Sequence, residues 1–367
     1  MVLRCFKIRF MQKLSPLRLL QPLRRTLLAS ALALPTLALA QTVAKKAKPA
    51  KPAPAASPAP SPIPFAPLIN TPEVQAFIAR AVVAGVSAEL ANQLLNDSQM
   101  QPVVKRFMDP PPAGTRKNWA VYKARFTDAL RISKGQAFLR THAGAFERAS
   151  AKYGVPPAVI AAIIGVETMY GTYLGKFRLV DVLPTLAFDY PRRAEFFKDE
   201  LLAFMQLVQA GTLTSGTLGS FAGALGLPQF MPGSLKRYGA SSDGGAAIDL
   251  AGKPEDAITS VASFLAGHGW VRDMPIAFEA VDMDDIRAAS LLKPDATPSY
   301  DFSVVAPNAP PGTPRELKYA VIDLQHATGE HEYLLGTQNF HMLMQYNRSY
   351  FYAASVWYLA RRLGLQV

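Results

Sequence analysis

The chain has 367 residues, half of them apolar, which is long enough for one or two globular domains with a substantial core. Its net charge of +12 is unevenly placed: residues 1–68 contain eleven lysines and arginines and no acid, whereas the remainder has 28 basic and 27 acidic residues. This near-neutral remainder argues against a nucleic-acid-binding domain. The single cysteine is Cys5, so disulfide and thiol chemistry are excluded from the rest of the chain.

Residues 1–40 have the pattern of a secretory signal peptide. Seven basic residues and no acid precede the apolar run LLASALALPTLALA, which ends in a small-x-small triplet. The run is short for a membrane span, so we expect export with cleavage before Gln41. Residues 41–68 consist mainly of Ala, Pro, Lys and Ser and predict an extended linker that buries no core.

The folded region is expected over 69–367, and its helices begin at clear start signals. Thr71 before Pro72, and then Ser87, predict two helices between residues 71 and 97. A helix over 134–154 should end at Gly154, and a helix from Pro157 is apolar on all sides, which is typical of a buried central helix. Further amphipathic helices are expected over 192–211, 254–270 and 347–364.

Residues 275–335 differ from the rest because they combine seven prolines with short alternating runs such as YDFSVV and KYAVIDL. This pattern predicts a small β-rich insert. The fold class is therefore mainly α with a minor β part.

Familiar catalytic and metal-binding motifs are absent from the sequence. The five histidines have neither the i, i+4 nor the HExxH spacing of a zinc site, so no metal site is predicted. The chain also contains no GxSxG elbow and no GxxxxGK[ST] loop, which leaves serine hydrolases and P-loop proteins without support.

One carboxylate stands out at the end of the apolar helix, in AAIIGVETMYG. Glu167 follows six apolar or small residues, and an apolar surrounding favours the neutral acid over the charged form. A carboxylic acid that keeps its proton near neutral pH can act as a general acid. A glutamate that simply emerges into water is the alternative on local sequence alone.

A second segment, GSFAGALGLPQFMPGS over residues 219–234, mixes glycines with polar and aromatic side chains. Ser220 and Gln229 lie in it beside Phe221 and Phe230. Such a loop presents polar groups and flat apolar faces, which suit the hydroxyls, N-acetyl groups and ring faces of a sugar. A structural turn is the alternative.

Four segments together resemble a known family: GVETMYG, SFAGALGLPQFMP, AITSVASFLAGHGW and QYNRSYFYA. They resemble, in the same order, the lytic murein transglycosylases of the B type, glycoside hydrolase family 103. The resemblance covers roughly residues 70–367. It implies a lysozyme-like α core with an N-terminal helical part and the small β-containing insert. It also implies cleavage of the β-1,4 bond between N-acetylmuramic acid and N-acetylglucosamine in peptidoglycan, leaving a 1,6-anhydromuramic end.

The resemblance assigns roles to particular residues. Glu167 matches the catalytic acid/base of the family. Glycan-binding positions of the family fall on these residues: Ser220, Gln229, Tyr122, Tyr346, Asn347 and Tyr352. Phe264 stands where the family often has a cleft tyrosine, so its ring can still stack on a sugar but the hydroxyl is lost.

No cofactor is expected, although the family often carries a calcium loop. The matching segment, 241–256, has Ser241 and Gly245 at the first two acidic positions of that loop and keeps Asp249 and Asp256. Calcium prefers several oxygen ligands that include carboxylates, so this segment is a poor match.

The sequence leaves two alternatives open. A lysozyme-like muramidase would need a positioned water or a second acid, for which Asp181 and Asp189 are nearest in sequence. A non-catalytic peptidoglycan-binding protein would not need Glu167. The expected partners are peptidoglycan glycan strands, with cell-wall synthesis or division proteins as candidates and no nucleic acid. A monomer in the periplasm of a Gram-negative envelope is expected.

Overall fold

The computed structural model describes residues 61–109, 118–245 and 247–366, which all belong to one compact unit. The predicted signal peptide and residues 41–60 of the predicted linker lie outside the described residues. The fold begins earlier than residue 69, because strand β1 (Ile63–Pro64) pairs with β2 (Gln99–Met100) and Phe65 is fully buried. The predicted linker therefore extends too far at its C-terminal end.

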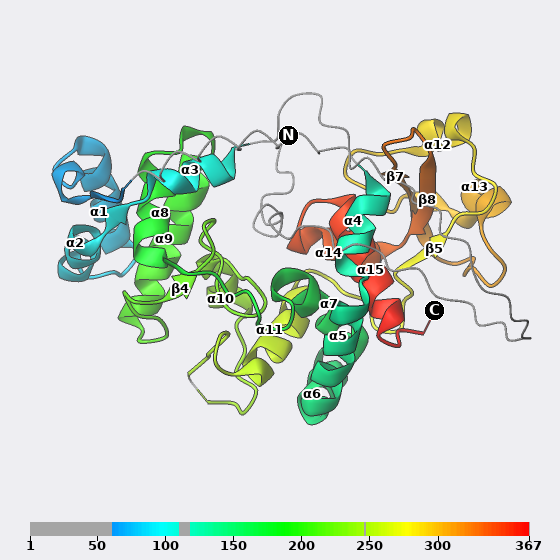
Figure 1. Cartoon of the computed structure of the whole chain (residues 1–367), viewed down its shortest axis with the longest axis horizontal. Helices are drawn as coiled ribbons and strands as arrows, with labels where there is room; N and C mark the ends of the chain where they lie inside the picture. Colours follow the sequence, from blue (N-terminus) through cyan, green and yellow to red (C-terminus); the bar gives the residue numbers. More distant parts are fainter. Residues whose placement is uncertain (1–60, 110–117, 246, 367) are drawn as a thin grey trace, which may run out of the picture. The chain divides into compact units, whose positions relative to one another are not determined.

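The first helices start where the sequence predicted them. Helix α1 (Pro72–Val83) has Pro72 in its first turn, where the missing N–H costs no hydrogen bond. Helix α2 (Ala88–Asp97) is capped by Ser87, whose Oγ accepts a hydrogen bond from the N–H of Leu90 at 3.1 Å. Helix α1 packs against α2, and α2 packs against α8 (Leu179–Phe188) and α9 (Ala194–Gln209), while α3 (Pro102–Met108) packs against α8. Helices α8 and α9 lie side by side in green in Figure 1.

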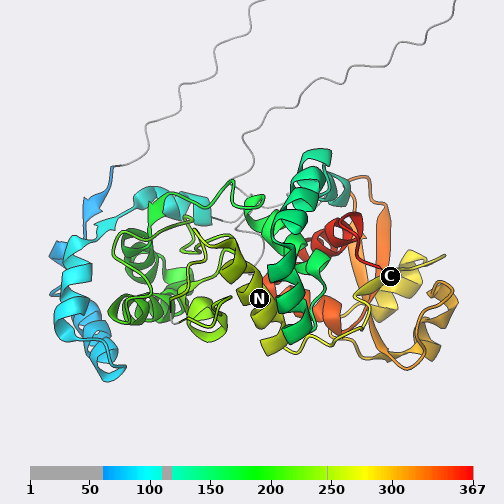
Figure 2. The ribbon, with the colours of Figure 1, turned by 90° about the horizontal axis from the view of Figure 1, so that it is seen from below.

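The central helices surround α7 (Pro157–Thr168), which is buried along nearly its whole length. Its neighbours include α5, α6, α11 and α15, and in both ribbon views α15 (red) lies beside the strands of the insert (Figures 1 and 2). The bounds are α4 (Trp119–Phe126), α5 (Ala129–Thr141), α6 (Ala143–Tyr153), α10 (Pro232–Tyr238), α11 (Pro254–Gly267), α14 (Gln338–Tyr346) and α15 (Tyr350–Arg362).

The helix predicted over 134–154 is in fact two helices, because α5 ends and α6 begins at His142. The predicted C-terminal end of α6 is right, since Gly154 adopts a left-handed conformation with φ of 74°. A break between two helical segments of similar composition leaves no strong pattern in the sequence.

The β-containing insert is confirmed. Its strands form an antiparallel sheet in the order β5–β8–β7–β6, and Phe278, Tyr319 and Leu335 belong to a second, smaller core of its own. The insert also contains short helices that the sequence did not predict. The bounds are β5 (Ala277–Glu279), α12 (Asp285–Leu291), β6 (Tyr300–Asp301), α13 (Phe302–Val305), β7 (Lys318–Gln325) and β8 (His331–Gly336).

A third strand pair joins the segment after α7 to the loop after α9. Strand β3 (Phe177–Arg178) pairs with β4 (Leu218–Gly219), so Phe177 lies opposite Gly219. This pairing brings the loop that contains Ser220 next to the chain that leaves Glu167. The remaining short elements are the 3-10 helices η2 (Ala66–Leu68), η3 (Pro191–Arg193) and η4 (Ala306–Asn308).

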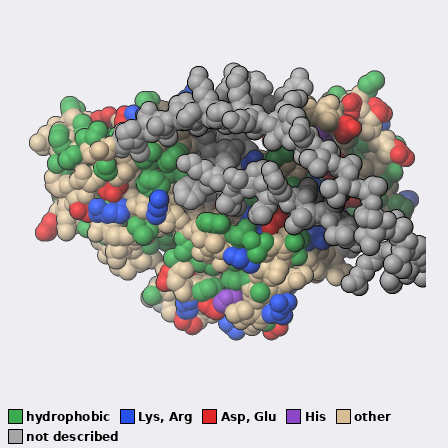
Figure 3. All heavy atoms as spheres, in the orientation of Figure 1, with side chains coloured by type: hydrophobic (Ala, Val, Ile, Leu, Met, Phe, Trp, Pro, Cys, Tyr) green, Lys and Arg blue, Asp and Glu red, His purple; other side chains and the backbone are tan. Residues whose placement is uncertain are grey.

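Charges of both signs share the surface of the described residues. Lys and Arg side chains are interspersed with Asp and Glu on the part of the face in Figure 3 that grey atoms do not cover. Among the described helices none alone is long and apolar enough to cross a membrane. Helices α6 and α7 together are long and apolar enough by length and composition only, and the pair is bent by 113°.

Candidate active site

Glu167 lies in the last turn of α7. Residues Val159 to Ile164 of this helix are fully buried, whereas Glu167 is half-buried. Helix α15 packs along α7, so the carboxylate of Glu167 lies beside residues of α15. The position of Glu167 is thus set by core packing, as the apolar sequence before it indicated.

The turn after Glu167 is strained and tightly held. Met169, Tyr170 and Gly171 have φ values of 49°, 56° and 86°, and left-handed backbone is costly for the first two. The ring of Tyr170 packs against two glycines: a Cβ atom on Gly135 or Gly165 would lie 2.2 or 2.4 Å from the Tyr170 Oη. These contacts fix the end of the helix that carries the carboxylate.

Tyr352 of α15 contacts the carboxylate directly. Its Oη donates a hydrogen bond to Oε1 of Glu167 at 2.9 Å. Its ring lies nearly parallel to that of Tyr346, with 6.2 Å between the ring centroids. Burial raises the pKa of both tyrosines well above 10, and the charge of Glu167 raises the pKa of each further. Both hydroxyls therefore keep their protons and act as donors.

Tyr346 joins this group to the loop that contains Gln229. The Oη of Tyr346 donates to the carbonyl oxygen of Pro228 at 2.6 Å. The next residue, Gln229, is buried with φ of 50°, and its Nε2 donates to the carbonyls of Gly226 at 3.0 Å and Leu174 at 3.3 Å. The loop is therefore tied both to the end of α14 and to the segment that follows α7.

Thr168 docks the same loop beside the carboxylate. Its Oγ1 donates to the carbonyl of Leu227 at 2.9 Å and accepts the N–H of Gly171 at 3.1 Å. Ser220 lies at the beginning of the loop, where its Oγ accepts the N–H of Ala224 at 3.1 Å. Thr168 thus links the loop to Glu167, and Ser220 stabilises the turn from which the loop starts.

The other predicted residues lie around these groups at different depths. Tyr122 of α4 has its ring 5.4 Å from that of Phe351 and contributes to the raised pKa of Tyr352, after burial and Glu167. Asn347 is half-buried and extended, directly after α14. Phe264 is 6% exposed and its ring packs 4.7 Å from that of Tyr346, so little of the ring is open for the predicted stacking on a sugar.

Arg131 is a contributor that sequence reasoning missed. Its side chain is 1% exposed, and its Nη1 donates to the carbonyl oxygen of Gly165, two residues before Glu167. Its Nη2 donates to the carbonyl of Arg125 at 3.1 Å, and Asp128 is its ionic partner. A lone arginine in a weakly amphipathic helix carries no signal of burial, so only the packing of α5 against α7 reveals it.

The two acids considered for a second catalytic role have structural partners. Asp181 accepts the N–H of Gln99 at 2.9 Å and faces Arg178, and Asp189 pairs with Lys105 at 2.7 Å. Of the described acids, Glu167 is the one whose charge raises the pKa of Tyr346 and Tyr352. The tyrosine cluster thus surrounds one carboxylate rather than a pair.

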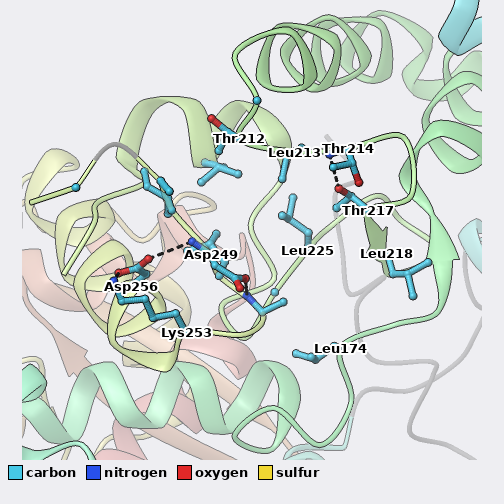
Figure 4. A pocket seen from close by; sticks show the side chains of 18 of the residues that line it. Leu174, Thr212, Leu213, Thr214, Thr217, Leu218, Leu225, Asp249, Lys253 and Asp256 are labelled. Carbon is cyan, nitrogen blue, oxygen red and sulfur yellow. Dashed lines mark hydrogen bonds and ion pairs between the residues drawn. The ribbon is translucent and has the colours of Figure 1, made fainter. Parts of the chain in front are cut away.

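A cavity of about 760 Å³ lies on the other side of the loop. Its walls are the segment 211–218, residues 225–226 with Leu174 and Gly175, and the segment 243–256, and Glu167 is not among its described lining residues (Figure 4). Within the described ranges no group of three or more His, Cys, Asp or Glu side chains gathers as a metal site. The cavity is therefore separate from the carboxylate.

Comparison with known proteins gives this arrangement a family context. The family model described as "Transglycosylase SLT domain" matches residues 70–361. The membrane-bound lytic murein transglycosylase B of Escherichia coli is 35% identical over 311 residues, which cover 81% of this chain and 84% of that protein.

Two solved structures have a similar fold. The catenated lytic transglycosylase SltB1 from Pseudomonas aeruginosa is 34% identical with a TM-score of 0.74, over 81% of this chain and 98% of that chain. The Escherichia coli lytic transglycosylase Slt35 in complex with calcium is 34% identical with a TM-score of 0.71, over 80% and 93% of the two chains. The mainly α fold class predicted from the sequence is confirmed.

Proposed function

The chain belongs to the lytic murein transglycosylases that carry the transglycosylase SLT domain, and we propose that Glu167 performs their reaction as the single acid and base. The substrate is peptidoglycan, and the bond that is cleaved is the β-1,4 bond between N-acetylmuramic acid and N-acetylglucosamine. The observation that carries this assignment is the hydrogen bond from the Tyr352 hydroxyl to Glu167, on a carboxylate fixed at the end of a buried helix.

In the first step Glu167 acts as an acid. Tyr352 donates to Oε1 of the carboxyl group, and Glu167 in its neutral form carries the proton that this step transfers. That proton passes to the glycosidic oxygen as its bond to C1 of the muramic unit breaks. The bond from Tyr352 strengthens as charge develops on the carboxylate, which stabilises the transition state.

In the second step Glu167 acts as a base. The ionised carboxylate takes the proton of the C6 hydroxyl of the same sugar while O6 bonds to C1, which closes a 1,6-anhydro ring and restores the acid. This attack is intramolecular and benefits from a high effective concentration when the ring is held in place. Tyr346, Tyr122, Asn347, Ser220 and Gln229 are the groups we assign to holding the glycan.

Hydrolysis would require a water molecule activated by a base, and inverting or retaining glycosidases use a second carboxylate. The nearest sequence candidates, Asp181 and Asp189, are bound to Gln99 and Lys105 instead. This favours the intramolecular route over the muramidase alternative. The tyrosine contacts to Glu167 in turn favour an enzyme over a peptidoglycan-binding protein without activity.

We place the enzyme in the periplasm of a Gram-negative envelope. The support is the signal-peptide pattern of residues 1–40 and the relative from Escherichia coli, which is named as membrane-bound. Residues 41–60 would then act as a tether between the envelope and the folded region. A monomeric state and contacts with cell-wall synthesis or division proteins remain predictions.

The variant Glu167→Gln tests the assignment. It keeps the shape of the side chain and can still accept a hydrogen bond from Tyr352, but it cannot carry the transferred proton. We expect release of soluble muropeptides from purified sacculi to fall by at least about 100-fold, with binding to sacculi and the melting temperature retained. The control is Glu147→Gln, an exposed acid of α6, which should keep full activity. Substantial activity in Glu167→Gln would refute the role.

A further inference from the structure

The segment between α10 and α11 is held together by an internal ion cluster. Lys253 lies just before α11, and its Nζ is 2.7 Å from Oδ2 of Asp243 and 3.4 Å from Oδ1 of Asp256. The side chain of Asp256 is buried, whereas that of Asp243 is exposed. One ammonium group therefore bridges a carboxylate of the segment, Asp243, and a carboxylate in the first turn of α11, Asp256.

The carboxylate oxygens of this segment already have protein donors. Oδ1 of Asp243 accepts the hydroxyl of Ser241 and the N–H of Gly245 at 3.0 Å. The two oxygens of Asp256 accept the N–H groups of Ser242 at 2.8 Å and Asp249 at 3.1 Å. The hydrogen bonds from Lys253 and Ser241 hold the pKa of Asp243 well below its usual range, so this carboxylate is ionised.

Asp249 is also occupied locally. Its Oδ1 accepts the N–H groups of Ala251 at 2.9 Å and Gly252 at 2.8 Å, which forms a turn before Lys253. Calcium takes six to eight oxygen ligands at 2.3–2.6 Å, with several carboxylates turned toward one point. Here Asp249 turns to the backbone and Asp243 and Asp256 turn to an ammonium, so these residues do not fit a calcium ion.

We propose that the ammonium of Lys253 takes the place of a divalent cation in this segment, so that the enzyme keeps the segment folded without calcium. The similar Slt35 of Escherichia coli has been solved in complex with calcium, and on this proposal the present chain does not need that ion. A covalently attached cation is always present, and its effect is therefore independent of the metal concentration.

This ion cluster lies behind the loop of the active site. The carbonyl of Leu250 accepts the N–H of Leu227 at 2.8 Å, and Gly226 packs so closely that an added Cβ would lie 2.5 Å from Leu250 Cβ. Leu227 in turn accepts the hydroxyl of Thr168, the neighbour of Glu167. Figure 4 shows Lys253, Asp249 and Asp256 on one side of the cavity and Thr214 and Thr217 on the other.

The first test uses the unmodified protein and does not depend on its activity. Melting temperatures are measured in excess EDTA and in millimolar calcium chloride, and calcium binding is followed by titration calorimetry. We expect the two melting temperatures to agree within about 1 °C and no heat of binding. A higher melting temperature with calcium, or a measurable binding heat, would overturn the proposal.

The second test removes the ammonium. Lys253→Met should lower the melting temperature in EDTA by at least about 2 °C, because the buried Asp256 loses its counter-ion. Lys253→Arg keeps the charge and should lose less than half as much. The matched control is Lys105→Met, since Lys105 is equally exposed and also lies 2.7 Å from a carboxylate, that of Asp189. Equal losses in Lys253→Met and Lys105→Met, or in Lys253→Met and Lys253→Arg, would contradict the role of Lys253.

Discussion

The hydroxyl of Tyr352 contacts the carboxylate that we propose as the catalytic group. It donates to Oε1 of Glu167, and its raised pKa, caused by burial and by the charge of Glu167, keeps it a donor over the working pH range. A hydrogen bond to an ionised group contributes about 1.5–3 kcal/mol. This bond is strongest when Glu167 is charged, which in the mechanism that we propose is the state formed as the glycosidic bond breaks.

We therefore expect Tyr352→Phe to keep the fold and lose rate. The ring stays and only the donor is removed, so release of muropeptides should fall by about 10- to 100-fold, with little change in melting temperature. The matched control on the same helix is Tyr358→Phe, which removes a hydroxyl that interacts with Glu279 instead. Unchanged rates in Tyr352→Phe would mean that the bond has no catalytic role.

At this scale the sequence indicated candidate side chains for the site but not the groups that those side chains contact. Glu167 is visible because an apolar helix ends in one acid. Three hydrogen bonds of the site join segments that are far apart in the chain. Gln229 donates to the carbonyl of Leu174, Tyr346 donates to that of Pro228, and the buried Arg131 donates to that of Gly165. Such contacts leave no periodic pattern in the sequence, so they could not be predicted from it.

At the scale of elements, the end of α7 is the part on which the site depends. Two glycines on α5 and α7 leave room for the ring of Tyr170, which fills the space between the helices. The strained turn of Met169 and Tyr170 is tolerated because this packing holds it. The orientation of Glu167 thus depends on small residues in two neighbouring helices.

Gly165→Ala should disturb this arrangement. The new Cβ would lie 2.4 Å from Oη and 2.6 Å from Cζ of Tyr170, so the ring must move and the helix end with it. We expect a loss of about 1–3 kcal/mol in the free energy of unfolding, measured by urea denaturation, and lower activity. Gly144→Ala on the exposed face of α6 is the control and should be neutral or slightly stabilising. Equal stability of both variants would contradict the packing argument.

The helices with caps and strong periodicity could be predicted, and the short ones could not. Helices α1, α2, α7, α11 and α15 match the predicted segments, because Pro, Ser or Thr marks their starts. Helix α9 matches its predicted segment through its amphipathic pattern alone. Helix α8 contains Pro184 in its interior and is buried on all sides, so its sequence does not distinguish it from a strand or a loop.

At the scale of the whole molecule, one carboxylate joins the β-containing insert to the helical region. Glu332 of β8 accepts the indole N–H of Trp119 at 2.9 Å and lies 3.3 Å from Nζ of Lys123 and 3.1 Å from Nε2 of His326. Burial alone would raise the pKa of Glu332, but the hydrogen bond from Trp119 and the nearby Lys123 outweigh it and lower that pKa. Helix α4, which carries Tyr122, is thereby attached to the insert.

A carboxyl group with a lowered pKa in the folded state stabilises the protein above its unfolded pKa of about 4.5, and this stabilisation is lost as the pH falls through the folded pKa. Glu332→Gln should therefore lower the melting temperature at pH 7, and the difference from the wild type should be smaller at pH 3. Glu330→Gln, an exposed acid of the same hairpin, is the control and should have no effect at either pH. A difference that is the same at both pH values would show that charge is not the cause.

The central claim is that one carboxylate cleaves the glycan by an intramolecular attack, and its most direct test is the chemistry of the products. Muropeptides released from purified sacculi by the protein are analysed by mass spectrometry before and after borohydride reduction. The account predicts products lighter than the hydrolysed muropeptides by one water molecule, with a muramic end that borohydride does not reduce. Muropeptides with a reducible muramic end would mean that water attacks C1, and they would contradict the account.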